Sequence, residues 1–210
     1  MKKILVFAVV TLFSISVFAQ SVFDYNGIYY KLTSSTTVSV IANPDGTKYS
    51  GDITIPYTVK LGTIDFTDFT VTSIADSAFY FCTELTSIDL PTSIVAIGKG
   101  SFYGCSLLKS IKLPNITNVP YDAFFNCKEL ESVDISNVTT IDEDAFYGCS
   151  SLKSISDLSN VKEIPRYAFY SCNSLKSINI PNVITIGERA FYDCAFDTID
   201  LPKVETIGVR

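Results

Sequence analysis

The chain contains no histidine and no tryptophan among its 210 residues. Without histidine, the side chain that most often transfers protons near neutral pH and binds metals is missing. The 16 lysine and arginine residues form no basic stripe and are outnumbered by 22 acidic residues, which disfavours binding to phosphate backbones. No glycine-rich phosphate loop is present either. These absences predict no catalytic residue, no metal site, no cofactor and no nucleic-acid partner.

Charged residues are scarce at the N-terminus. A basic start, Met1 to Lys3, precedes an apolar run from Ile4 to Ala19, which is typical of a secretory signal peptide over residues 1–19. A membrane-spanning helix is the alternative, but a run of 16 residues is shorter than the ~20 needed to cross a bilayer. We therefore expect a secreted or cell-surface chain with no membrane insertion after signal cleavage.

What the chain has in abundance is one repeated block. The pattern Ala-Phe-Tyr-x-x-Cys-x-x-Leu-x-Ser-Ile-x-Leu-Pro, followed by Val-x-x-Ile-Gly, recurs six times with a period of 22 or 23 residues. Two columns keep this register, namely Phe79, Phe102, Phe124, Phe146, Phe169 and Phe191, and Cys82, Cys105, Cys127, Cys149, Cys172 and Cys194. A unit of this length cannot close a core alone, so its copies must stack into a solenoid.

The coil of residues 123–141 illustrates the pattern within one repeat. Phe124, Cys127 and Leu130 have the spacing of a short helical turn with one apolar face. Residues 132–135 then alternate between polar and apolar, which predicts a short strand, and a second apolar pair indicates a further extended stretch. A corner follows that holds Gly98, Gly187 and Gly208 in some coils and Pro120, Asp142 and Pro165 in others, so glycine is not expected to be required there.

Stacked coils place their strands side by side. The expected strands begin at Ile53, Ile88, Ile111, Val133, Ile155, Ile178 and Ile199. Helical turns are bulkier than strands and should occupy the outer curve. The predicted fold class is therefore an α/β repeat solenoid, a right-handed coil with a concave parallel β-sheet and short helical turns on the convex side.

The sequence divides into three parts. After the signal peptide, residues 20–52 contain short β-rich runs separated by the turn sequence at 43–46, and we interpret them as an N-terminal β-rich cap with hairpin strands. Residues 53–210 form a solenoid of about seven coils, with an insertion near residues 60–70 in the first coil. The repeat is expected to continue past its last coil, so a C-terminal cap is missing.

The six cysteines of an exported chain would ordinarily suggest disulfides. Equivalent side chains in successive coils run parallel, about 4.8 Å apart, whereas a disulfide needs converging Cβ atoms ~3.8 Å apart. A metal site would likewise need converging ligands rather than a column. The favoured interpretation is a ladder of buried thiols, with disulfides as the alternative.

The repeat resembles a known family. Residues 145–155, with the sequence Ala-Phe-Tyr-Gly-Cys-Ser-Ser-Leu-Lys-Ser-Ile, and residues 180–187 are similar to the BspA-like, Treponema-type leucine-rich repeats. The resemblance covers about residues 53–208, and it departs at Phe196, where leucine is usual, and at Asp157, which is an additional residue. It implies an exported or surface protein of host-associated bacteria, with adhesins among its relatives and no shared catalytic residues.

Two exposed columns are candidates for binding. One strand position varies between coils, and its members Lys112, Asp134, Ser156 and Asn179 form the predicted ligand-binding site on the concave face. The alternative is that Asp89, Lys112 and Asp134 only form cross-strand charge pairs that support the sheet. Tyrosines that follow the buried phenylalanines form the second column, for which packing between coils is favoured over sugar or protein binding.

The sequence favours a non-catalytic module for protein or glycan binding, with a host or cell-surface partner. The alternatives are a structural surface component without a specific ligand and a carboxylate glycosidase. The glycosidase would need paired acids, and Asp89 and Asp134 are the nearest such pair on the predicted sheet. Lys112 between them would neutralise the pair, so the enzyme is disfavoured.

Overall fold

The computed structural model describes residues 22–61, 68–113 and 115–209. The predicted signal peptide of residues 1–19 lies outside this part of the chain. Within the described ranges every regular element is a β-strand. Among these residues, no helix is long and apolar enough to span a bilayer.

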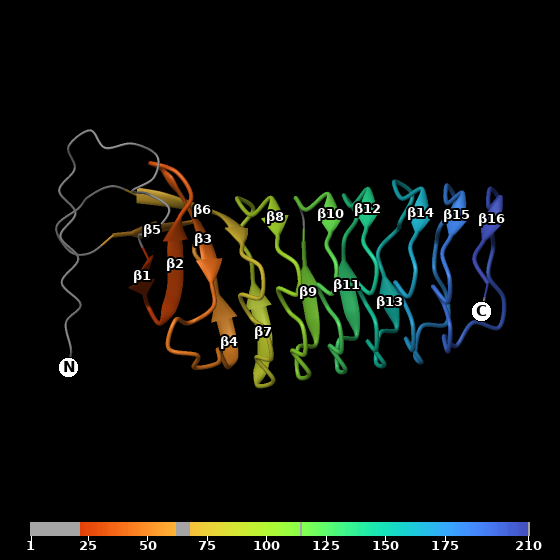
Figure 1. The fold of residues 1–210 in the computed structure, drawn as a ribbon, viewed down its shortest axis with the longest axis horizontal. Helices are drawn as coiled ribbons and strands as arrows, with labels where there is room; N and C mark the ends of the chain where they lie inside the picture. Colours follow the sequence, from red (N-terminus) through yellow and green to blue (C-terminus); the bar gives the residue numbers. More distant parts are fainter. Residues whose placement is uncertain (1–21, 62–67, 114, 210) are drawn as a thin grey trace.

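The first-strand side of the solenoid is built from one strand in each of the early coils (Figure 1). Its strands are β4 (Gly51–Thr54), β7 (Leu85–Asp89), β9 (Ser110–Lys112), β11 (Ser132–Asp134) and β13 (Ser154–Ile155). β4 pairs with β7, and β9, β11 and β13 form a parallel sheet in which Ser110, Ser132 and Ser154 are register partners. The predicted parallel strands are therefore confirmed in these coils.

Strands expected at Ile178 and Ile199 are not formed, because regular pairing ends at β13. The extra residue Asp157 follows shortly after β13 and shifts the chain. The backbone N–H of Leu158, rather than that of residue 157, donates to the carbonyl of Asn179 at 3.2 Å. The neighbouring coils therefore remain connected, but without a continuous strand ladder.

A second set of short strands runs along the other side of every coil. It comprises β8 (Ala96–Ile97), β10 (Asn118–Val119), β12 (Thr140–Ile141), β14 (Glu163–Ile164), β15 (Thr185–Ile186) and β16 (Thr206–Ile207). β10 pairs with β12, and β14, β15 and β16 pair in order, all in parallel. The second extended stretch predicted from the apolar pair is thus confirmed.

The expected helical turns on the convex side are wrong. The segments from the corner to the cysteine are consecutive turns: within the coil of Ala123, the N–H groups of Phe125 and Cys127 donate to the carbonyls of Asp122 and Phe124 at 3.1 Å. The intervening N–H groups donate to the next coil instead, as Phe124 does to Ala145 at 2.8 Å. Asp122 and Asn126 have positive φ values of 57° and 55°, which a right-handed helix cannot accommodate.

Glycine is required at the corner where it occurs, contrary to the sequence expectation. A Cβ atom on Gly187 would lie 2.4 Å from the backbone nitrogen of Arg166 in the preceding coil. A Cβ atom on Gly98 would lie 2.3 Å from the backbone nitrogen of Asp76. Moving backbone atoms aside is costly. At both glycines, neighbouring coils therefore lie too close together for a residue with a side chain.

The N-terminal strands join the second-strand side. β1 (Val22–Tyr25), β2 (Ile28–Leu32) and β3 (Thr37–Ile41) are antiparallel, as the sequence predicted for its hairpin strands. β3 pairs in parallel with β6 (Asp68–Ile74), which also pairs with β8. β5 (Thr58–Lys60) pairs antiparallel with β6, so the predicted insertion near residues 60–70 is a hairpin arm, of which residues 62–67 lie outside the description.

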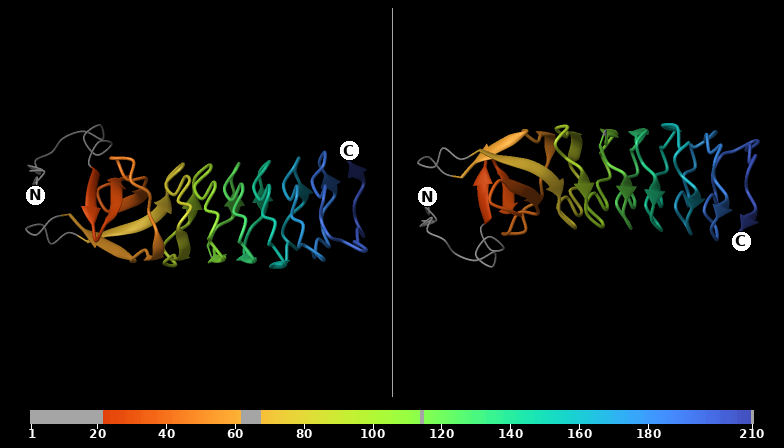
Figure 2. Two further views of the ribbon diagram at one scale, coloured as in Figure 1. Left: turned by 90° about the horizontal axis from the view of Figure 1, so that it is seen from below. Right: turned by 90° about the horizontal axis from the view of Figure 1, so that it is seen from above.

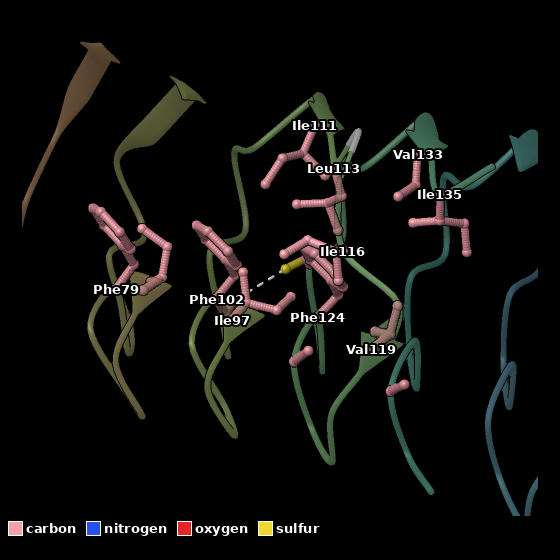
Figure 3. Packing of buried hydrophobic residues seen from close by; sticks show 14 of the residues in the cluster. Phe79, Ile97, Phe102, Ile111, Leu113, Ile116, Val119, Phe124, Val133 and Ile135 are labelled. Carbon is pink, nitrogen blue, oxygen red and sulfur yellow. Dashed lines mark hydrogen bonds between the residues drawn. The ribbon is translucent and has the colours of Figure 1, made fainter. Parts of the chain in front are cut away.

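The core lies between the two strand sides. The rings of Phe79, Phe102 and Phe124 stack in parallel, with centroids 5.2 and 5.4 Å apart, and Figure 3 shows them in a row from one coil to the next. Figures 1 and 2 show the coils stacked along a nearly straight axis. The curvature of the predicted concave first-strand face is slight in these views.

Candidate functional site

The predicted binding column lies on the first-strand side. Lys112 on β9 and Asp134 on β11 are register partners, and both side chains are exposed. No ion pair joins these two described residues, whereas Glu131 and Lys153, at the entrance to the strands, pair at 2.8 Å. The alternation of charge therefore supports the sheet at its entrance, and leaves Lys112 and Asp134 presented to solvent.

The other two members of the column take part in holding the coils together. The hydroxyl of Ser156 accepts a hydrogen bond from the backbone N–H of Ile135 at 2.7 Å. In the preceding coil the equivalent N–H, that of Leu113, donates to the backbone carbonyl of Asp134. The amide of Asn179 donates to the carboxylate of Asp157 at 3.0 Å. Near the additional residue Asp157, the side chains of Ser156 and Asn179 thus form hydrogen bonds between coils, where a backbone carbonyl serves as the acceptor in the preceding coil.

The predicted column of buried thiols is confirmed. All six cysteines are free, and only Cys194 is less than fully buried. The thiol of Cys105 donates to the carbonyl of Phe79 in the preceding coil at 3.0 Å, and the cysteines that follow repeat this contact. Burial raises the pKa of Cys194 to about 12 and that of Cys149 well above its ordinary value. These sulfurs are therefore packed, hydrogen-bonded groups and not nucleophiles.

An outer aromatic ladder follows the inner phenylalanines along the turn side. Neighbouring rings are 4.6–4.9 Å apart, and the planes of Tyr103, Phe125 and Tyr147 are within 5° of parallel. Except at the two ends of the outer ladder, each ring is stacked between the rings of the preceding and the following coil. Ring faces are consequently not free to stack on a sugar, which supports the packing interpretation of this column.

A shallow depression opens beside this ladder. Its volume is about 500 Å³, and five tyrosines, one phenylalanine, Asp122, Asp144 and Arg189 line it. Tyr121, at the rim, is exposed, whereas both aspartates are half-buried. The depression thus combines apolar walls with two carboxyl groups, a mixture that suits a ligand with an apolar stem and a polar or charged end.

The pKa values of Asp122 and Asp144 are both raised. Burial, followed by the charge of Asp144, raises the pKa of Asp122 to about 6. Burial and the charge of Glu143 raise the pKa of Asp144, although Arg166 and a hydrogen bond from Tyr121 oppose this shift. A carboxylate pair of this kind is stabilised by any cation that enters the depression.

The sequence reasoning did not identify these two aspartates. They lie two residues before the inner phenylalanine of the repeat, in a column that otherwise holds Ser77, Gly100, Tyr167 and Arg189. This mixture of residue types does not indicate a site, and the column was expected to lie in a helical turn. The one available signal is that two adjacent coils carry the same acid at the same repeat position. Among the described residues, no group of histidine, cysteine, aspartate and glutamate side chains is arranged to hold a metal.

The chain shares its repeat and its fold with bacterial leucine-rich repeat proteins. A leucine-rich cell surface protein from Faecalibacterium prausnitzii is 29% identical, with a TM-score of 0.75 over 90% of this chain and 50% of that chain. A leucine-rich repeat protein from Eubacterium ventriosum is 26% identical, with a TM-score of 0.64 over 84% of this chain and 50% of that chain. The chain therefore spans about half the length of these two structures.

The T. pallidum leucine-rich repeat protein shares the fold, at 24% identity and a TM-score of 0.60, over 79% of this chain and 86% of that chain. A comparison with curated proteins gave no match. Residues 28–153 and 139–210 match the BspA-type leucine-rich repeat region, in six copies. The two matched segments cover nearly all of the described residues and their repeats. The chain therefore belongs to the BspA-type leucine-rich repeat family.

Proposed function

We propose that the chain is an exported, non-catalytic binding module that recognises a protein or glycan on a host or cell surface. The observation that carries this proposal is the alignment of the first-strand side, where register-matched strands fix exposed side chains that differ between coils. Rigid scaffolds of this kind allow the residues at a few positions to change without disturbing the framework. The Faecalibacterium relative is a leucine-rich cell surface protein, which supports the proposed location.

The proposed contact residues are Lys112 and Asp134, with Ser156 and Asn179 at the end of the same column. Lys112 and Asp134 are exposed and adjacent on β9 and β11, so a single partner can contact both. Ser156 and Asn179 each hold a structural hydrogen bond, and we assign them a supporting role at the edge of the site.

The test is a pull-down of host matrix proteins and glycans with the purified chain and with the Lys112→Glu, Asp134→Lys double variant. A binding module should lose its partner while its circular dichroism spectrum and unfolding midpoint stay unchanged. The matched control is the Glu131→Lys, Lys153→Glu swap, which exchanges an exposed ion pair on the same side. The control should retain the partner.

Other outcomes separate the alternatives. A structural surface component would capture no partner with any variant, and a glycosidase would release sugar from a bound glycan. Binding that survives the Lys112→Glu, Asp134→Lys change but fails when Tyr147 and Tyr170 become serine would move the site to the turn side. Loss of binding in the Glu131 and Lys153 control as well would show that general surface charge, and not the column, attracts the partner.

A further inference from the structure

The turn side carries a second surface with chemistry that the first-strand side lacks. Asp122 and Asp144 lie in the aromatic-lined depression and hold the same backbone position in successive coils, with φ values of 57° and 58°. Aspartate tolerates this left-handed conformation, which by itself would explain one acid. The same position holds Tyr167 and Arg189 in later coils, both also at positive φ, so the backbone does not demand an acid there.

The two carboxyl groups lack a compensating cation of their own. Among the described residues, none of the ion pairs includes Asp122 or Asp144. Arg166 acts on Asp144 from the next coil, but its guanidinium pairs with Glu188 at 3.3 Å. Their raised pKa values, which result first from burial, show that this negative charge is poorly solvated. The depression therefore has an apolar wall, and its two carboxyl groups outnumber the one arginine of its lining, Arg189.

Elsewhere on the same face, the chain already has a cation bound between an aromatic ring and a carboxylate. Within the same face, the guanidinium of Arg166 lies over the ring of Tyr167 at 4.5 Å, while its Nε pairs with the carboxylate of Glu188. A cation over a tyrosine ring with a carboxylate beside it is a favourable arrangement for both lysine and arginine. Around Asp122 and Asp144, the exposed Tyr121 supplies the aromatic part. Arg189 also lines the depression, but its Nε pairs with the carboxylate of Glu188 at 3.8 Å and not with either aspartate.

We propose that Asp122, Asp144 and the tyrosines around them bind a lysine or arginine side chain of a partner protein. The long alkyl stem of either residue would lie along the aromatic walls, and its charged end would sit between the two carboxylates. This inference rests on the proposed function, since it takes the chain to be a binding module, and it adds a second face and the chemistry of its partner.

The probe for this site is a fluorescein-labelled decapeptide of alternating lysine and glycine, measured by fluorescence polarisation near neutral pH at about 0.15 M salt, where long-range attraction is screened. An alternating arginine and glycine peptide should also bind. The same lysine peptide with every side chain acetylated keeps its length but loses its charge, and it should not bind.

The test variant is Asp122→Asn with Asp144→Asn, which preserves shape and removes both charges. We expect it to weaken binding of the lysine peptide by about tenfold or more. The control variant Glu84→Gln with Glu129→Gln removes the same number of negative charges from exposed positions elsewhere, and should change binding by less than about twofold. Unfolding midpoints of both variants verify that they are folded.

Several results would overturn the assignment. Equal weakening by the two double variants would show attraction to net charge alone, and equal binding of the acetylated peptide would show that no cation is recognised. A neutral glycan that binds the chain and is lost in the Asp122 and Asp144 variant would make the occupant a carbohydrate. Failure of the peptide assay leaves the first-strand pull-down unaffected, so the two proposals fail separately.

Discussion

Along the turn side, the inner and outer aromatic columns continue through all six coils from Phe79 to Tyr192, whereas along the first-strand side regular pairing stops after β13. Both sides belong to the same coils and have the same period. They differ in how the coils are joined. Turn-side contacts alternate between bonds within a coil and bonds to the next, and stacked rings fill the space between. The extra residue Asp157 follows a strand, and it interrupts the strand ladder while the aromatic columns of the same coils continue.

The largest expected effect comes from breaking the inner column of the turn side. Phe124→Ala removes a fully buried ring that stacks on Phe102 and Phe146, and should lower the free energy of unfolding by about 3–5 kcal/mol. Phe125→Ala, in the half-buried outer ladder, is the control and should cost roughly 1 kcal/mol. Urea unfolding measures both. Similar losses of unfolding free energy would mean that the inner and outer ladders contribute equally to stability.

A smaller effect is expected at the corner between the two sides. Gly187→Ala forces a Cβ atom against the backbone of Arg166 and should destabilise the chain by about 1–3 kcal/mol. Asp142→Ala, at the same corner of another coil, already has a Cβ atom and should change stability by no more than about 0.5 kcal/mol. A tolerated Gly187→Ala would show that neighbouring coils can separate at little cost.

On the first-strand side, the informative change is Ser156→Ala. It removes the hydroxyl that accepts from the N–H of Ile135, a fully buried residue, and should cost about 1–3 kcal/mol. Ser154→Ala, two residues earlier and exposed, should be nearly neutral. Hydrogen exchange at the Ile135 amide gives the direct readout: protection should fall in the first variant and stay in the second.

The acid pair predicts a pH dependence that the strand side does not share. Because the folded-state pKa of Asp122 is about 6, above its unfolded value of 3.8, its ionisation opposes folding. Its contribution to stability is favourable at low pH and is lost as the pH rises from about 4 to about 6. The charge of Asp144 adds to the shift of Asp122, and Glu143, Arg166 and Tyr121 in turn act on the pKa of Asp144. Asp122→Asn should flatten this part of a plot of unfolding temperature against pH; an unchanged slope would contradict the assignment.

The sequence was sufficient for the parts of the fold that depend on burial. Inward residues such as Phe102, Cys105 and Leu108 recur at a fixed period. An apolar residue at a repeated position predicts burial whatever the backbone conformation. The same spacing was wrongly assigned to helical turns. Turns whose every fourth residue is left-handed also place these side chains on one face, so periodicity alone cannot separate the two.

The remaining differences depend on backbone conformation and on neighbours in other coils. Some left-handed positions hold Phe81, Tyr167 and Arg189, which are not recognised signals for positive φ, although other positions hold asparagine, aspartate or glycine, which are. The role of Ser156 appears only when Ile135 of the preceding coil is brought beside it. Asp122 and Asp144 become a pair only through stacking, because 22 residues separate them in the sequence.

The column of buried thiols provides one chemical probe of local opening in each repeat. Because one cysteine lies in every coil from Cys82 to Cys194, and each is inert until its coil opens, the rate at which an alkylating reagent labels a given sulfur measures the local opening of that coil. The half-buried Cys194 should react first, and the central sulfurs last. Without any substitution to introduce a probe, labelling of the native cysteines can therefore locate fraying, capping and the binding of a partner to within one coil of the solenoid.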